Sequence, residues 1–251
     1  MPANPERDYQ PRPGLLDGRV ILVTGAGDGI GRAAALAYAE HGADVVLLGR
    51  TEEKLEAVFD DIESRTKTRP VVVPADLLHA SEDAVTTLYH AIRREYARLD
   101  GILHNAGLLG PRVPIADYPM QDWLDVMQVN VNAAFLLTRG MMPLLEEAPD
   151  ASIVFTSSGV GRRGRADWGA YAVSKFAVEG LVDVLADELA AAGRIRVNSL
   201  NPGATRTAMR AAAYPDEDLA TLPCAEDHMP LYLYLMGPDS KGVTGQRFDT
   251  S

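Results

Sequence analysis

The chain has 251 residues, 47% of them hydrophobic and 24% charged, a balance that predicts one globular domain with a large buried core. Its formal net charge of −11 argues against a nucleic-acid-binding surface, because neutralising phosphates requires a basic face. The only cysteine, Cys224, excludes an internal disulfide, and no apolar segment of the sequence reaches the roughly 18 residues that a membrane span needs. We therefore expect a cytoplasmic protein that binds neither nucleic acid nor membranes.

Short apolar runs alternate with helical stretches after a polar, Pro-rich start, which we interpret as a flexible arm over 1–16. Strands are predicted at 19–24, 44–48, 70–74, 101–104, 151–156, 194–200 and around Phe248. Helices are predicted at 32–41, 52–65, 81–98, 121–141, 171–192 and 229–236. Strands without strict alternation, separated by helices, indicate a parallel sheet covered on both faces. Residues 17–251 are therefore expected to form a single doubly wound α/β domain, with a substrate lid at about 204–226.

A glycine-rich turn, Gly25-Ala26-Gly27-Asp28-Gly29-Ile30-Gly31, lies between the first strand and the first helix. This context is typical of dinucleotide sites, because the glycines let the backbone approach a pyrophosphate that then meets the helix N-terminus. The alternative is that the glycines only make a tight strand-to-helix turn.

The ends of the next strands supply further candidate contacts to a dinucleotide. The second strand ends at Gly49-Arg50 with no acidic residue for a ribose hydroxyl, whereas a guanidinium can pair with a 2′-phosphate, which favours NADP over NAD. The alternative is an exposed arginine at a strand end. Asp76 follows the third strand and suits an adenine amino group, and Asn105-Ala106-Gly107 follows the fourth with small residues that permit close approach.

Tyr171 and Lys175 are four residues apart at the start of an Ala-rich helix, so they share one helix face. A nearby ammonium lowers the pKa of a phenol, and such a Tyr can exchange a proton with a carbonyl oxygen or an alcohol. The alternative is a solvated helix face. Ser157 and Ser158 end the fifth strand, at the edge where parallel sheets bind ligands, and Asn130 is one of several amides within an apolar helix.

In their order and spacing, the motifs Thr24–Gly31, Asn105–Gly107, Asn130, Ser158, Tyr171 with Lys175, and Asn201-Pro202-Gly203 resemble the classical members of the short-chain dehydrogenase/reductase family. The likeness is greatest to bacterial oxoacyl-carrier-protein reductase-like members and spans Arg19 to Asp249, with the Rossmann-type fold that this implies. It implies that Tyr171 is the general acid/base, that Lys175 also holds the nicotinamide ribose, that Ser158 binds the substrate oxygen, and that Asn130 bends its helix and holds a water. The cofactor-binding residues that it implies are Thr24, Gly25, Asp28, Gly29, Ile30, Gly31, Arg50, Asp76, Leu77, Asn105, Ala106, Gly107, Tyr171, Lys175, Pro202, Gly203 and Thr205. No metal is implied.

The resemblance implies an NADP-dependent oxidoreductase that interconverts a carbonyl and a secondary alcohol, runs as a reductase on a small-molecule substrate, and forms a homodimer or homotetramer. The alternative is a non-catalytic NADP-binding sensor or scaffold of the same fold. Two departures from the family pattern are Asp28, where many NADP-using members carry a basic residue, and His104, where the family commonly has Asn.

Five arginines in the loop after Ser158 and in the lid add a hypothesis about the substrate. They form either an ordinary charged surface or a positive rim for an anionic or carrier-bound acyl substrate. These residues are Arg162, Arg163, Arg165, Arg206 and Arg210.

Overall fold

The computed structural model describes residues 9–250, which form one seven-stranded parallel sheet in the order β3-β2-β1-β4-β5-β6-β7. The strands are β1 (Val20–Thr24), β2 (Asp44–Gly49), β3 (Val71–Pro74), β4 (Gly101–His104), β5 (Ala151–Thr156), β6 (Ile195–Asn201) and β7 (Arg247–Asp249). The helices are α1 (Gly29–Glu40), α2 (Glu52–Arg65), α3 (Glu82–Tyr96), α4 (Met120–Met127), α5 (Ala133–Glu146), α6 (Gly169–Ala190), α7 (Ala208–Ala213) and α8 (Met229–Met236). The predicted doubly wound sheet of seven parallel strands is confirmed.

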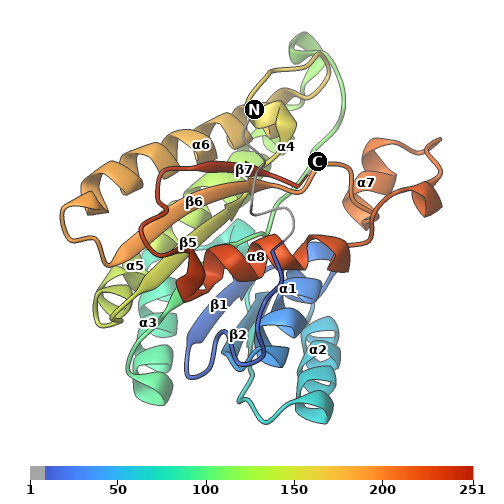
Figure 1. Cartoon of the computed structure of the whole chain (residues 1–251). Coiled ribbons are helices and arrows are strands. Elements are labelled where there is room, and N and C mark those ends of the chain that lie inside the picture. The colour runs from blue at the N-terminus through green and yellow to red at the C-terminus, as the bar shows by residue number, and fades with distance from the viewer. Residues whose placement is uncertain (1–8, 251) are drawn as a thin grey trace.

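Each face of the sheet buries its own apolar core, as Figure 1 shows for the helices on either side. Along β1, Ile21 and Val23 belong to the core formed with α1, α2 and α8, whereas Val20 and Leu22 belong to the core formed with α3, α5 and α6. Successive residues of a strand point to opposite faces, so a strand buried on both faces must be apolar throughout. This explains why the first strand lacks alternation in the sequence.

The strand order reverses at β1, which pairs with β2 on one side and β4 on the other. Chain connections leave the neighbouring strands in opposite directions at such a point, and a crevice opens at the carboxyl ends of the strands. The segment containing α7 projects beyond the sheet (Figure 1). The fold therefore places the predicted glycine turn, the ends of β4 and β5, and the segment 204–226 around one region.

The prediction of one continuous helix over 121–141 is wrong, because the helix is interrupted and ends later. The structure has α4, then a π-helical segment η3 (Gln128–Asn132), then α5, which continues past Pro143 to Glu146. A π-helical turn holds one residue more than an α-helical turn. The predicted distortion at these amides is thus confirmed, although its form was not predicted.

The flexible arm predicted over 1–16 is wrong for the part that the structure describes. Leu15 and Leu16 are buried in the core, and the Leu16 amide donates to the His41 carbonyl at 2.9 Å. Tyr9 packs edge-on against Tyr234. Residues 1–8 lie outside the described range. Hydrophobic anchors at Leu15 and Leu16 thus extend the domain N-terminally beyond the predicted boundary at 17.

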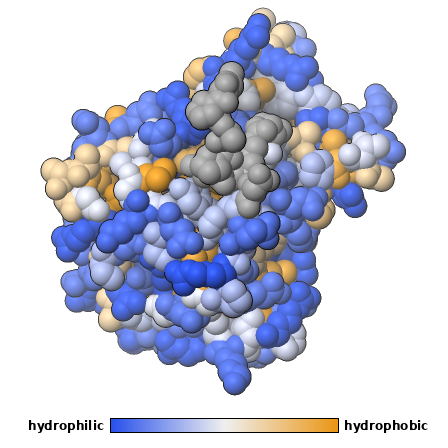
Figure 2. Space-filling view, in the orientation of Figure 1, coloured by the Kyte–Doolittle hydropathy of each residue, from blue (hydrophilic) through white to orange (hydrophobic). Residues whose placement is uncertain are grey.

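The face in Figure 2 consists mainly of hydrophilic residues, as a chain with 24% charged residues leads one to expect. Within residues 9–250, no helix is long and apolar enough to cross a membrane.

Candidate active site

The glycine turn between β1 and α1 brings the backbone to one wall of the crevice. Gly25 has a φ of +69°, which favours glycine, and a Cβ on Gly31 would lie 2.1 Å from the Gly25 carbonyl oxygen. Only a glycine at position 31 lets α1 begin this close to the turn. The backbone here is therefore accessible to a ligand, as the sequence predicts for a pyrophosphate site.

Asp28 begins α1 and also holds a cation that the sequence analysis did not single out. Its carboxylate accepts from the Gly29 amide at 2.7 Å and forms an ion pair with Lys54 in the first turn of α2. The hydrogen bond from Lys54 is the main cause that lowers the pKa of Asp28. Many NADP-using members of the family carry a basic residue where this chain has Asp28. Here the ion pair brings the Lys54 ammonium close to that position instead. The spacing of Arg50 and Lys54 in the sequence is the signal that could have pointed to this second cation.

Thr24 joins the ends of β1 and β4. Its hydroxyl oxygen accepts from the amides of Asn105 and Ala106, each at 3.0 Å, and its hydroxyl donates to the Leu103 carbonyl at 3.3 Å. The small-residue segment Asn105–Gly107 is therefore fixed beside the glycine turn. Thr24 shapes the crevice but does not line it.

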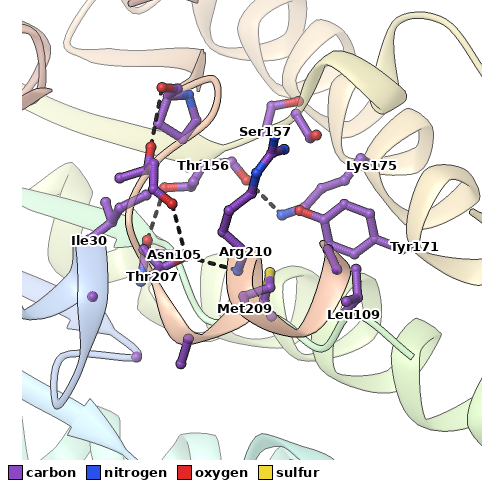
Figure 3. Close-up of a pocket in the computed structure, with 18 of the residues that line it drawn as sticks. Ile30, Asn105, Leu109, Thr156, Ser157, Tyr171, Lys175, Thr207, Met209 and Arg210 are labelled. Carbon is purple, nitrogen blue, oxygen red and sulfur yellow. Dashed lines mark hydrogen bonds between the residues drawn. The ribbon is translucent and has the colours of Figure 1, made fainter. Parts of the chain in front are cut away.

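Tyr171 and Lys175 lie side by side at the start of α6 (Figure 3). Ser158, which follows the end of β5, lines the same cavity. The Ser158 hydroxyl lies near the Tyr171 hydroxyl, where it acts to lower the pKa of that phenol. The Lys175 ammonium lies 5.6 Å from the centre of the Tyr171 ring and donates to the Thr156 carbonyl at 2.7 Å. The three residues that the sequence predicts for proton transfer thus form one group.

The protonation states of this group depend on burial more than on the pairing predicted from the sequence. Burial raises the pKa of Tyr171 to about 12, and the neighbouring Ser158 hydroxyl opposes this only in part. Burial lowers the pKa of Lys175 to about 8, against the opposing effect of the Glu179 carboxylate. The pKa of Tyr171 is therefore raised on balance, and the net lowering expected from its pairing with Lys175 is not found. The desolvation of both groups outweighs their interaction.

Asn130 lies in η3 and is buried. It does not line the crevice that contains Ser158, Tyr171 and Lys175. Its side chain accepts from the Leu108 amide at 2.7 Å and donates to the Leu108 carbonyl at 3.0 Å and to the Ser174 hydroxyl at 2.9 Å. A cavity of about 10 Å³, lined by Asn130 and Lys175 among others, has room for about one water molecule. The structure thus accommodates the predicted water, whose presence stays a prediction.

Glu179 is a buried carboxylate that the sequence analysis missed. It accepts hydrogen bonds from Ser157 and, at 2.8 Å, from Ser199, and it lies 3.5 Å from Arg162 and 3.1 Å from Arg247. Ser157 is therefore committed to this network, whereas Ser158 faces Tyr171, which agrees with the choice of Ser158 over its neighbour. A Glu four residues after Lys175, on the same face of the helix, is the signal that could have found it.

Two cavities contain most of the predicted site residues. The central cavity, of about 310 Å³, is lined by Gly25, Asp28, Gly29, Ile30, Asn105, Ala106, Gly107, Ser158, Tyr171, Lys175, Pro202, Gly203 and Thr205, among others. A second cavity, of about 300 Å³, shares part of the glycine turn and is lined further by Arg50, Lys54, Asp76 and Leu77. Gly31, Thr24 and Asn130 lie outside both. Two joined cavities with this lining suit the two halves of a dinucleotide, which is extended in such folds.

An aromatic cluster that was not predicted lines the central cavity. Trp168 packs against Tyr171 and Tyr214, with ring centres 5.8 and 5.9 Å apart. The Arg112 guanidinium lies 4.9 Å from the ring centres of both Trp168 and Tyr214 and donates to the Ala213 carbonyl. These residues come from three separate segments, so neither motif nor local spacing predicts that they meet.

The five arginines of the predicted rim do not act together. Arg162 pairs with Asp249 and Glu179 and donates to the Phe248 carbonyl, so it holds the loop to β7. Arg206 donates to the carbonyls of Ala220 and Leu222 within its own segment. The prediction that these two belong to a substrate rim is unsupported, because neither lines the cavities at the site. Arg163, Arg165 and Arg210 remain at the site.

The fold and the site define a class: a doubly wound parallel sheet with a glycine-turn crevice and a Ser-Tyr-Lys group at its edge. The chain belongs to the short chain dehydrogenase family, which matches residues 19–218. It is thus an oxidoreductase of this family, and the resemblance inferred from the motifs is confirmed.

Relatives cover nearly the whole chain. The uncharacterized oxidoreductase YciK of Escherichia coli K12 is 56% identical over 241 residues, which are 96% of this chain and 95% of YciK. A short chain dehydrogenase of Escherichia coli CFT073, solved in complex with NADPH, is 55% identical and superposes with a TM-score of 0.93 over 96% of this chain and all (100%) of that chain. The 3-oxoacyl-[acyl-carrier-protein] reductase FabG of Thermotoga maritima is 32% identical over 241 residues, 92% of this chain and 95% of FabG.

Proposed function

We propose that the protein is an NADPH-dependent reductase that converts a carbonyl compound to a secondary alcohol. The observation that carries the proposal is the position of Tyr171, together with Ser158 and Lys175, in a cavity that is also lined by the glycine turn. A proton donor and a dinucleotide site that share one cavity are what a hydride-transfer enzyme needs.

The residues present fit a nicotinamide dinucleotide. The glycine turn and the N-terminus of α1 would hold the pyrophosphate, Asp76 and Leu77 would lie at the adenine, and Lys175 at the nicotinamide ribose. NADPH supplies the hydride when bound, while the chain provides position and electrostatics. The relative from Escherichia coli CFT073 that was solved with NADPH supports the choice of cofactor.

Two cations favour NADP over NAD. Arg50 and Lys54 line the same cavity at the junction of β2 and α2, where a ribose 2′-phosphate would lie. Asp28 offsets part of the Lys54 charge through their ion pair, but the Arg50 guanidinium is exposed and has no ion pair among residues 9–250. A planar guanidinium suits a phosphate group.

Proton transfer is assigned to the chain's own groups. Tyr171 donates its proton to the carbonyl oxygen, and Ser158 donates a hydrogen bond to the same oxygen as charge develops there. The buried Lys175 ammonium, below Tyr171, favours the phenolate that this transfer leaves. Water carried by Asn130 would connect Lys175 to solvent.

The apolar wall indicates the kind of substrate that fits. Leu109, Trp168, Met209 and Tyr214 line the cavity and pack into one apolar cluster. Aromatic and aliphatic walls with a few polar groups orient a small organic ligand. We therefore assign the substrate to ketones or aldehydes with an apolar part next to the carbonyl.

A homo-oligomer is part of the proposal. Phe135 on α5 is 47% exposed, and Phe176 and Val184 on α6 are 46% and 55% exposed. Large exposed apolar side chains on two neighbouring long helices are typical of a protein interface.

The test is a panel of carbonyl compounds, including acyl thioesters, steroids, sugars and small ketones, followed by loss of NADPH absorbance. We expect turnover with at least one apolar ketone or aldehyde and much slower turnover with NADH. If the protein binds NADPH but no member of the panel is reduced, the sensor or scaffold function replaces the enzyme.

A further inference from the structure

A third cavity adjoins the central one, and Gly203 is the only residue assigned to the cofactor that lines it. It has a volume of about 650 Å³ and shares with the central cavity the residues Ser158, Trp168, Asn201, Gly203, Arg210 and Tyr214. It is lined by no residue of the glycine turn 25–31 or of Asn105–Gly107. A molecule with its carbonyl at Ser158 could therefore extend into this cavity without meeting the dinucleotide.

Three guanidinium groups line this cavity, from Arg163, Arg165 and Arg210, and none of its lining residues is acidic. Among residues 9–250, no carboxylate pairs with Arg163 or Arg165, whereas Arg210 is paired with Glu217 at 2.5 and 2.6 Å. The three arginines and Glu217 together keep a local charge of about two positive units, in a chain whose net charge is −11.

Tyr214 positions two of these three groups. Arg165 donates to the Tyr214 hydroxyl at 2.9 Å, and the Arg210 guanidinium lies 3.8 Å from the centre of the Tyr214 ring. Figure 3 shows Arg210 extending from α7 into the space between Ser157 and Tyr171. The loop after Ser158 and the segment of α7 are thus joined through one aromatic side chain that lines both cavities.

We propose that Arg163, Arg165 and Arg210 bind an anionic group of the substrate, a carboxylate or a phosphate monoester, while its carbonyl lies at Ser158 and Tyr171. This inference rests on the proposed reductase function and adds the chemical class of the substrate. Guanidinium groups donate paired hydrogen bonds to such anions, and a cavity of one charge sign also raises the rate of encounter. The apolar part of the substrate would span Trp168 and Tyr214, which separate the two ends.

The test compares a keto acid with its methyl ester, which has the same carbon skeleton and no charge, and with a phosphate-bearing ketone of similar length. In the double variant Arg163→Gln/Arg165→Gln, we expect kcat/KM for the keto acid or the phosphate to fall about tenfold at low salt, mainly through KM. The ester should change less than about twofold. The loss should shrink with salt, because the screening length falls from about 30 Å at 0.01 M to about 8 Å at 0.15 M.

A matched control removes the same charge elsewhere. Arg94 and Arg194 are exposed, and the double variant Arg94→Gln/Arg194→Gln should leave the ratio of acid to ester unchanged. Equal losses for acid and ester in the Arg163/Arg165 variant, or an equal loss in the control, would overturn the inference. A larger effect on the phosphate than on the carboxylate would identify the phosphate as the natural group.

A binding readout separates this inference from the proposed function. Trp168 lines the cavity, so in a Trp123→Phe background its fluorescence can be titrated with glutarate or inorganic phosphate. Saturable binding that the Arg163/Arg165 variant loses would support the inference even in a protein that reduces no carbonyl. Titrations that are indistinguishable in the two proteins would contradict it, whatever the panel of substrates shows.

Discussion

Glu179 lies one helical turn after Lys175 on α6, and the two side chains, of opposite charge, are both buried. The carboxylate opposes the effect of burial and leaves the pKa of Lys175 at about 8, below its ordinary value of 10.5. The ammonium is therefore charged below about pH 8 and loses its charge as the pH rises through that value. If a charged Lys175 supports proton transfer, reductase activity should fall above about pH 8.

Replacing Glu179 by Gln should move this alkaline loss to lower pH. The amide keeps hydrogen-bonding capacity for Ser157 and Ser199 but removes the negative charge that raises the pKa of Lys175. The measurement is kcat against pH, with Asp187→Asn, an exposed carboxylate on the same helix, as the control. If kcat of the variant falls by the same factor at every pH and the alkaline limb does not shift, Glu179 does not act on the pKa of Lys175.

Tyr171→Phe should lower kcat by at least about a hundredfold, because general acid catalysis contributes on that scale. The Kd for NADPH should change little, since Tyr171 is only one of many residues assigned to the cofactor and the aromatic ring is kept. Tyr89→Phe on α3 is the matched control, because it removes a hydroxyl that lines none of the three cavities at the site. Wild-type turnover in the Tyr171→Phe variant would disprove the assignment of the proton donor.

The two cations at the β2–α2 junction predict a specific cofactor preference. Arg50→Ala and Lys54→Ala should each raise the Kd for NADPH several-fold to about tenfold, the range of a charge-assisted contact at a partly exposed site, and leave the Kd for NADH nearly unchanged. Lys67→Ala, which removes an exposed cation after α2, should affect neither. Fluorescence titration of the wild type and each variant with NADPH and with NADH gives the dissociation constants. If a variant binds NADPH and NADH more weakly by the same factor, the 2′-phosphate does not bind in this cavity.

Phe176→Asp should dissociate the proposed oligomer, because it places a charge among the exposed apolar residues of α6 and α5. Ile115→Asp is the control: Ile115 is 65% exposed but lies outside both helices. Light scattering at micromolar concentration gives the mass, and circular dichroism confirms that both variants stay folded. A monomeric wild type would contradict the proposal at once.

Much of the fold could be predicted because the relevant signals are local. Helices 52–65 and 229–236 and strands 101–104 and 151–156 have the predicted limits, since apolar runs and their breaks lie within each segment. The same holds for Tyr171 and Lys175, whose spacing on one helix decides that they meet.

What could not be predicted depends on contacts between distant segments or on burial. Trp168, Arg112 and Tyr214 form one wall although they come from three parts of the chain. Arg162 and Arg163 are neighbours in sequence, yet one is bound to Asp249 and the other lines a cavity. The high pKa of Tyr171 follows from desolvation, which a pattern of residues does not contain.

The π-helical segment η3 makes the length of this part of the chain as important as its residue types. In an α-helix each residue is rotated by about 100° about the helix axis relative to the residue before it. The extra residue of a π turn therefore rotates the faces of α5 by about that angle relative to those of α4. With this offset, Asn130 reaches Leu108 and Ser174 on the inner side, while Phe135 on α5 is exposed. Deleting one residue, such as Val131, would restore a regular helix and rotate one half against the other. A surface loop would tolerate such a deletion. Here it should rotate Asn130 away from Leu108 and Ser174, or Phe135 away from the exposed face of α5.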